Sequence, residues 1–179
     1  KGNADYHNSA SDYILATLHR PSNVDKKDNL LDFLDILNTI RSLCNYKVIF
    51  PAHPRTLKKI SSYGLLEDME NLGVDIIEPI GYFQFLNLQM NSLCVITDSG
   101  GLQEESCILG VPCITLRENT ERPETLTVGS NYLVGMSQKL FEKSFKKIIQ
   151  RKNKTWKNPF GDGLSGKRIA KIIKQEMKK

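Results

Sequence analysis

The sequence predicts an α/β domain in which helices cover both faces of a parallel sheet, a three-layer architecture. Short apolar runs alternate with longer segments of helical character along the chain, and this alternation indicates βαβ units with parallel strands. Polar clusters directly follow four of the apolar runs. Because ligands bind beyond the carboxyl ends of parallel strands, we expect these clusters to form one site at that edge of the sheet.

The amino-terminal half contains three of the expected strands. Residues 13–18, 47–50 and 74–77 are short apolar runs. Between the first two, residues 29–43 carry apolar side chains at the spacing of a helix with a wide apolar face. A second helix is expected over 55–63, where a glycine follows and ends it.

The second half continues the alternation. A short helix is expected over residues 82–90 and a strand over 93–96. A helix then opens at a glycine pair and ends at Gly110, and apolar runs at 112–116 and 131–134 predict the last strands. Loops are expected where polar, proline or glycine residues cluster, at residues 19–23, 51–54, 78–81 and 117–124.

The end of the chain is strongly basic. It carries 12 basic and 18 acidic side chains up to residue 142, but 13 basic and 2 acidic ones after it. Over 138–151 and 165–177 the basic residues are interleaved with apolar ones at helical spacing, which predicts two amphipathic helices with solvated basic faces. A nucleic-acid-binding tail is the alternative, and the helical patterning favours the helices, with no nucleic-acid partner.

Composition indicates a soluble protein with one domain in this chain. The 179 residues are 40% hydrophobic and 25% charged, which suffices for one core. No apolar run approaches the roughly 20 residues that span a bilayer, and residues 1–10 indicate a polar leader or an interdomain linker. The cysteines show no C-x-x-C spacing, so we expect free thiols, no metal site and a cytoplasmic protein. They are Cys44, Cys94, Cys107 and Cys113.

The most informative motif is the turn at residues 97–105, which reads TDSGGLQEE and follows an apolar strand. Gly100 and Gly101 let a ligand approach the backbone, and the first N–H groups of the helix point at it. A phosphate or diphosphate suits such a helix start. We therefore expect a nucleotide-diphosphate site at Ser99, Gly100 and Gly101, with Asp98 as a cap of the turn.

Tight binding needs further groups, because a helix N-terminus contributes only about 0.3–1 kcal/mol towards an exposed anion. Arg122 is a candidate for a bidentate contact to the diphosphate, and a surface arginine paired with Glu121 or Glu124 is the alternative. Glu105, about one turn into the helix, is a candidate acceptor for both ribose hydroxyls. Its neighbour Glu104 is expected to be solvated, because adjacent helix positions face different directions.

Two of the three histidines follow strands. His19 and His53 each stand where an apolar run gives way to a loop, and an imidazole there can donate a hydrogen bond to a departing diphosphate. For His53 a local cap or turn partner is the alternative, and His7 in the leader is expected to play no part. The histidines lack metal-ligand spacing, and neither a G-x-G-x-x-G nor a Walker motif occurs, which disfavours metal, dinucleotide and Walker-type sites.

Six segments in fixed order resemble the carboxyl-terminal half of the non-hydrolysing UDP-N-acetylglucosamine 2-epimerases. These segments are residues 17–25, 51–54, 98–105, 110–112, 117–124 and 158–163. The resemblance covers about residues 11–178. It implies a UDP-binding, Rossmann-like domain over 11–163, half of the two-domain glycosyltransferase-B (UDP-glycosyltransferase/glycogen phosphorylase-like) architecture. It also implies a last helix, over 164–179, that crosses towards the amino-terminal domain.

The resemblance implies an isomerase that interconverts UDP-GlcNAc and UDP-ManNAc by eliminating and re-adding UDP, without a cofactor, for bacterial cell-surface polysaccharide. In it, His19 assists UDP departure, Phe85 packs near uracil, and His53 lies near a cleft where some members bind a second UDP-GlcNAc as activator. Ile80 departs from the family, since some members have Gln there beside the base. The UDP-binding residues that the resemblance implies are Arg20, Phe85, Ser99, Gly100, Gly101, Glu105 and Arg122.

The acid/base carboxylates and an essential lysine of this family lie in an amino-terminal domain. The chain alone is therefore expected to bind UDP weakly and to be catalytically silent, and the full-length protein is expected to be a homodimer. Three alternatives stay open: an epimerase acting on UDP-FucNAc or a UDP-diacetamido uronic acid, a glycosyltransferase-B sugar transferase, and a non-catalytic nucleotide-sugar-binding module. A transferase is not expected to carry the segment TERPE at residues 120–124.

Overall fold

The computed structural model describes residues 13–150 and 155–177 of the chain. Within them, six parallel strands form one sheet in the order β3-β2-β1-β4-β5-β6. The strands are β1 (Tyr13–Thr17), β2 (Lys47–Pro51), β3 (Val74–Ile77), β4 (Val95–Thr97), β5 (Cys113–Thr115) and β6 (Asn131–Leu133). The expected leader at residues 1–10 lies outside the described residues.

The strand order reverses direction between β1 and β4. Strand β1 pairs with β2 on one side and with β4 on the other, where Leu15 lies opposite Val95 and Thr17 opposite Thr97. The chain steps outward from β1 to β3, then returns to the middle of the sheet and steps outward again from β4 to β6. Such a reversal point is where open parallel sheets bind their ligands, beyond the carboxyl ends of the strands.

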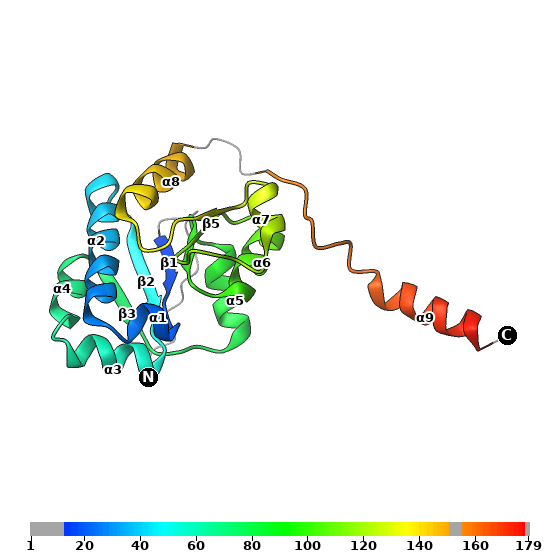
Figure 1. Ribbon diagram of the computed structural model, residues 1–179, viewed down its shortest axis with the longest axis horizontal. Helices are drawn as coiled ribbons and strands as arrows, with labels where there is room; N and C mark the ends of the chain where they lie inside the picture. The colour runs from blue at the N-terminus through cyan, green and yellow to red at the C-terminus, as the bar shows by residue number, and fades with distance from the viewer. Residues whose placement is uncertain (1–12, 151–154, 178–179) are drawn as a thin grey trace.

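Helices cover both faces of the sheet, so the predicted three-layer architecture is confirmed. Helices α2 and α8 pack together on one face, and α5 and α6 lie on the other (Figure 1). The helices are α1 (Pro21–Val24), α2 (Lys27–Leu43), α3 (Pro54–Ser62), α4 (Leu66–Asn71), α5 (Tyr82–Met90), α6 (Gly100–Leu109), α7 (Pro123–Thr127), α8 (Gln138–Gln150) and α9 (Ser165–Glu176).

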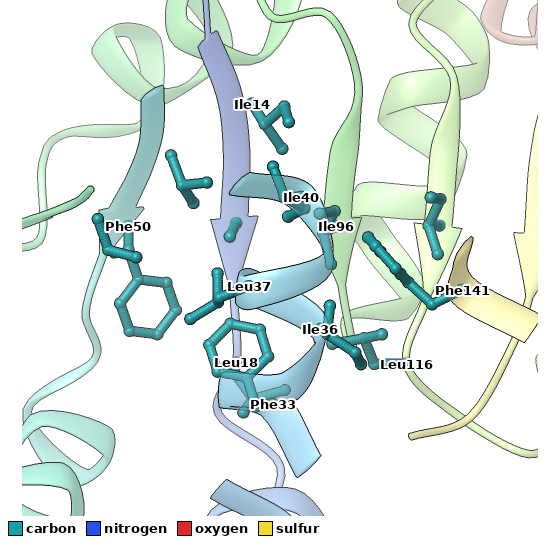
Figure 2. Close-up of a cluster of buried hydrophobic side chains, with 14 of the residues drawn as sticks. Ile14, Leu18, Phe33, Ile36, Leu37, Ile40, Phe50, Ile96, Leu116 and Phe141 are labelled. Carbon is teal, nitrogen blue, oxygen red and sulfur yellow. The ribbon is translucent and has the colours of Figure 1, made fainter. Parts of the chain in front are cut away.

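Alternation along the strands divides the core between the two faces. Ile14 and Ala16 of β1 belong to the larger apolar cluster, which α2 and α8 complete, whereas Leu15 belongs to the smaller cluster with residues of α5. In the larger cluster, Phe33 of α2 and Phe50 of β2 are both buried, with ring centroids 5.8 Å apart (Figure 2). Each such burial contributes about 1.5–3 kcal/mol, so this layer holds α2 firmly against the middle of the sheet.

The expected strands and long helices are confirmed, but three short helices were not expected. Helix α1 occupies most of the expected loop over 19–23, α4 follows the glycine that ends α3, and α7 begins inside the expected loop over 117–124. Pro21 and Pro123 stand at the start of α1 and α7, where the missing proline N–H carries no penalty. Helices this short show no periodicity that a sequence pattern can detect. Strand β4 also begins two residues later than expected.

The basic carboxyl-terminal segment forms the two predicted amphipathic helices. Helix α8 buries its apolar side against the core, whereas α9 extends away from the rest of the described chain (Figure 1). No side chain of α9 is buried. The exposed apolar residues of α9 and of its C-cap, Met177, form a stripe at helical spacing: Ile169, Ile172, Ile173 and Met177.

The four cysteines are free thiols, as expected; three are buried and Cys44 is half-buried. Among the described residues, no helix is long and apolar enough to cross a membrane. In the same part of the chain, no group of three or more His, Cys, Asp or Glu side chains is placed to hold a metal ion.

Candidate functional site

A pocket of about 310 Å³ opens at the carboxyl-terminal edge of the sheet. Its walls come from segments that follow β1, β2, β3 and β4, so chain segments far apart in the sequence meet there. The pocket-lining residues that matter below are His19, His53, Ile80, Phe85, Ser99 and Leu102. The structure thus brings together three of the four polar clusters that the sequence placed at this edge.

The fourth cluster, the loop over 117–124, borders a neighbouring pocket of about 280 Å³. Arg20 and Asn23 line this second pocket together with Arg117 and Glu118. Because Arg20 directly follows His19, the segment after β1 lies between the two pockets.

Helix α6 begins at Gly100, and no side chain of the described residues caps its first turn. Ser99 precedes the helix in an extended conformation, and its N–H donates to Oγ1 of Thr97 at 3.0 Å. A Cβ on Gly100 would lie 3.3 Å from Oε2 of Glu121, which is tighter than most such contacts. A glycine at position 100 therefore leaves room for this carboxylate and keeps the start of the helix accessible.

Asp98 does not cap the turn, contrary to the expectation. Its fully buried carboxylate reaches across to the segment after β1. Oδ2 accepts the N–H of His19 (3.0 Å), the N–H of Arg20 (2.8 Å) and Nδ2 of Asn23 (3.1 Å). Oδ1 lies 2.9 Å from Nδ1 of His19. The pairing of β1 with β4 explains this role, because it sets the ends of the two strands side by side.

His19 and Asp98 each favour the charged form of the other. The hydrogen bond that His19 donates to Asp98, helped by the charge of Asp98, raises the pKa of His19, while burial and the guanidinium of Arg20 oppose the rise. Burial acts to raise the pKa of Asp98, but hydrogen bonds from His19 and Arg20 outweigh it, and the pKa is lowered. The pair is thus suited to hold a protonated imidazole at the edge of the pocket.

One of the two carboxylate oxygens of Glu105 has no donor among the described residues. This oxygen, Oε2, is buried. Burial and then the charge of Glu104 raise the pKa of Glu105, and a hydrogen bond with Tyr82 acts the other way. An unpaired buried acceptor is unfavourable, so this oxygen is suited to a hydroxyl donor supplied by a ligand.

Arg122 pairs with Glu104, not with Glu121 or Glu124 side chains as one reading of the sequence had it. Its Nε donates to Oε2 of Glu104 at 2.7 Å, and its Nη1 donates to the carbonyl oxygen of Glu121 at 3.1 Å. Glu104 was expected to be solvated; its side chain is in fact only partly exposed and is paired with Arg122, since α6 packs beside α7. Both partners are about one-third exposed, and such pairs contribute about 0–1 kcal/mol. A phosphate can therefore replace Glu104 as the partner of Arg122 with little loss of free energy.

The role of Arg117 was not predicted from the sequence. This largely buried guanidinium makes two hydrogen bonds of 2.7 Å to the carboxylate of Glu121. The contact lowers the pKa of Glu121 to about 2, and Nη2 of Arg20 lies 3.9 Å from the same carboxylate. The opposite charges of Arg117 and Glu121, four residues apart, were the sequence signal that could have revealed this pair. Glu121 therefore holds Arg117 and Arg20 close to Gly100.

A buried network also ties the loop over 117–124 to α6. Gln103 is fully buried; its Nε2 donates to the carbonyl of Ser99 at 3.1 Å, and its Oε1 accepts from Nδ2 of Asn131 at 3.2 Å and from the hydroxyl of Thr120. The same hydroxyl oxygen accepts the N–H of Arg122 at 3.0 Å. Nothing in the sequence singles out Gln103, because a glutamine in a helix gives no sign of being buried.

His53 and Phe85 both line the first pocket, but they have different local roles. Nδ1 of His53 accepts the N–H of Arg55 at 3.2 Å and caps α3, which is the local role left open by the sequence. Phe85 of α5 and Ile80 pack partly against the smaller apolar cluster. Together they give the pocket one apolar side.

Fold and site define a Rossmann-like domain of the glycosyltransferase-B type, with its pocket where the strand order reverses. A sequence model described as UDP-N-acetylglucosamine 2-epimerase matches residues 2–174. The chain belongs to the UDP-N-acetylglucosamine 2-epimerase family.

Named relatives agree with this assignment. A UDP-N-acetylglucosamine 2-epimerase from Methanococcus maripaludis is 50% identical over 167 residues, which cover 93% of this chain and 45% of that protein. The crystal structure of Methanocaldococcus jannaschii UDP-GlcNAc 2-epimerase in complex with UDP-GlcNAc and UDP matches with 46% identity and a TM-score of 0.84, over 93% of this chain and 46% of that one. A Pseudomonas aeruginosa UDP-2,3-diacetamido-2,3-dideoxy-D-glucuronate 2-epimerase is 36% identical over 92% of this chain and 45% of its own length. The chain thus spans about half the length of these relatives.

Proposed function

We propose that this chain is the UDP-binding half of an isomerase that interconverts UDP-GlcNAc and UDP-ManNAc. The start of α6 carries the proposal. Uncapped N–H groups at Gly100 and an unpartnered carboxylate oxygen on Glu105 lie on one helix, as the diphosphate and ribose of a single nucleotide require. The names and ligands of the relatives support the same assignment.

In this proposal, UDP lies along the carboxyl-terminal edge of the sheet. The turn formed by Ser99, Gly100 and Gly101 holds the diphosphate, and Glu105 accepts the ribose hydroxyls. Arg122 leaves Glu104 to bind phosphate, and Arg20 adds positive charge from the segment after β1. Uracil then lies on the apolar side of the first pocket, whose lining includes Phe85 and Ile80.

This half assists the departure of UDP. The hydrogen on C2 of the sugar has no adjacent carbonyl to acidify it. When the C1–O bond breaks, its electron pair leaves on the diphosphate, positive charge develops at C1, and the C2 proton becomes acidic. Loss of that proton gives a glycal and UDP. Return of a proton to the opposite face of C2 and re-addition of UDP give the epimer. Fixed N–H groups, Arg122 and a protonated His19 lower the barrier by stabilising the departing anion.

The proton transfers at C2 are assigned to an amino-terminal domain that the relatives' extra length accommodates. We expect α9 to cover part of that domain with its stripe of Ile169, Ile172, Ile173 and Met177, all of which are exposed here. The chain by itself is then catalytically silent and binds UDP weakly. We assign the whole protein to the cytoplasm, as a homodimer that supplies ManNAc units for cell-surface polysaccharide.

One alternative to UDP-GlcNAc as the substrate has specific support. The Pseudomonas aeruginosa relative is named for a UDP-diacetamido uronic acid, and the sugar-contacting residues are assigned largely to the other half. UDP-GlcNAc is preferred because the more similar Methanococcus relative carries that name. A sugar transferase is disfavoured by the segment at 120–124, which the resemblance ties to epimerases. A non-catalytic module would bind UDP equally well and differs only in activity.

Titration calorimetry of this chain with UDP and with uridine tests the binding part of the proposal. We expect UDP to bind at least about tenfold more tightly than uridine, because the diphosphate gains charge-assisted hydrogen bonds. Equal affinity for the two ligands would mean that the start of α6 is not a diphosphate site.

A further inference from the structure

We propose that Asp98 is a positioning residue for His19, which it holds with the ring proton on Nδ1 so that Nε2 is the nitrogen offered to the departing diphosphate. The catalytic part of this inference rests on the function proposed above. The choice of ring nitrogen is a property of this chain alone and can be measured without any substrate.

The two oxygens of Asp98 have different tasks. Oδ2 accepts the backbone N–H groups of His19 and Arg20 and the side-chain amide of Asn23, all within 3.1 Å. These bonds fix the backbone after β1. Oδ1 is directed at Nδ1 of His19, at 2.9 Å, and its contact with the backbone N–H of the same residue is longer, at 3.2 Å. One oxygen therefore anchors the loop and the other orients the ring.

The burial of Asp98 means that its contact with His19 requires a proton on Nδ1. The Asp98 side chain is fully buried, whereas that of His19 is 44% exposed. A carboxylate that keeps its charge in such a place accepts hydrogen bonds and donates none. Nδ1 must therefore carry a proton to bond with Oδ1. In the neutral ring, Nε2 is then the free acceptor; in the protonated ring, both nitrogens are donors.

The surrounding charges favour the protonated ring. Asp98 faces His19 directly, and Arg20 is the cation that opposes it. The guanidinium of Arg20 is partly engaged elsewhere, because its Nε donates to the backbone carbonyl of Asp98 and its Nη2 lies 3.9 Å from Glu121. His53 lines the same pocket and bonds to the N–H of Arg55. A ring held in this way delivers a proton or a hydrogen bond from Nε2 towards the pocket.

The substitution Asp98→Asn separates the two tasks. An asparagine of the same shape keeps its oxygen at the Oδ2 position, so the bonds to the backbone after β1 remain. Its NH₂ group then takes the Oδ1 position and faces Nδ1 of His19. Two donors cannot share one hydrogen bond, so the ring must move its proton to Nε2 and present Nδ1 as an acceptor.

The measurement is long-range ¹H–¹⁵N NMR of the imidazoles across a pH titration, with His19 assigned by its loss in His19→Gln. We expect the Nδ1–H form in the neutral ring of the unsubstituted chain. In Asp98→Asn we expect the Nε2–H form and a lower pKa for His19. Asp75→Asn is the matched control, because Asp75 on edge strand β3 pairs with Lys47 and its change should leave the His19 signals unmoved.

An Nε2–H form in the unsubstituted chain would overturn the inference, and this result does not require Asp98→Asn to fold. Unchanged His19 signals in Asp98→Asn would also overturn it. In the whole enzyme, we expect Asp98→Asn to lower kcat for epimerisation about 10²-fold or more with little change in KM. If the ring switches but kcat stays, Asp98 does not position a catalytic group. If His19→Gln itself leaves kcat unchanged, the proposed role of His19 fails and the NMR result stands.

Discussion

The Nε of Arg122 lies 2.7 Å from Oε2 of Glu104, one residue before the carboxylate that we assign to the ribose. The arginine that we assign to the diphosphate is therefore held by an acidic side chain on the same helix that would hold the ligand. When UDP binds, the diphosphate must replace Glu104 as the partner of Arg122. Because Arg122 and Glu104 are both partly exposed, breaking their ion pair costs little free energy.

Removing either partner of this pair is expected to change UDP affinity in opposite directions. Arg122→Ala should weaken binding about tenfold or more, because a charge-assisted contact to phosphate is lost. Glu104→Gln should strengthen binding by up to about fivefold, since the competing ion pair is worth at most about 1 kcal/mol. Titration calorimetry of the two variants checks this. Weaker binding in Glu104→Gln would show that Arg122 stays with Glu104 when UDP binds.

Glu105 is expected to accept hydrogen bonds from the ribose hydroxyls. Glu105→Ala should weaken UDP binding by roughly 10- to 100-fold, the equivalent of about 1.5–3 kcal/mol for hydrogen bonds to a charged group. The unsubstituted chain should also prefer UDP over 2′-deoxy-UDP, and Glu105→Ala should lose this preference. If the variant still discriminates between the two nucleotides, Glu105 does not contact the 2′-hydroxyl.

Gly100 is expected to matter for binding more than for folding. A methyl group at this position presses on the Glu121 carboxylate, 3.3 Å away, which lies at the end of a flexible side chain. Gly100→Ala should therefore keep the thermal midpoint, helped by the better helix propensity of alanine, while weakening UDP binding several-fold. Gly166→Ala in α9 is the control, because no atom in the described part of the chain lies within 4 Å of its Cβ. Equal UDP affinity in the two variants would contradict the assignment of the turn.

The His19–Asp98 pair is expected to give a stability contribution confined to a pH window. The raised pKa of His19 stabilises the fold fully below the ordinary value of 6.5, and this contribution disappears as the pH rises through the folded-state pKa. The lowered pKa of Asp98 stabilises the fold above 3.8, and this contribution disappears as the pH falls through the folded-state pKa. Both contributions are therefore present between these two values.

Urea unfolding at several pH values measures this window. The difference in unfolding free energy between the unsubstituted chain and His19→Gln should be larger near pH 5 than near pH 9. His53→Gln is the comparison, because His53 contacts a backbone N–H and not a carboxylate. A difference that does not vary with pH would show that His19 and Asp98 do not interact as a charged pair in solution.

The sequence predicted the sheet and the edge that carries the site, because apolar runs, helical spacing and strand-end polarity are local patterns. It did not predict which polar groups meet within that edge. Asp98 contacts the segment after β1 and not its own turn, since strand order decides its neighbours. Arg122, at the start of α7, pairs with Glu104 of α6, and Gln103 is buried. Such contacts depend on how α6 and the loop over 117–124 pack, which no residue spacing encodes.

Deuterium exchange at C2 of UDP-GlcNAc in D₂O, catalysed by the whole protein that contains this chain, tests directly whether the protein is an epimerase. We expect both UDP-GlcNAc and UDP-ManNAc to acquire one deuterium at C2, and this chain alone to incorporate none. Release of UDP that requires an acceptor, with no deuterium at C2, would rule out an epimerase and identify a transferase.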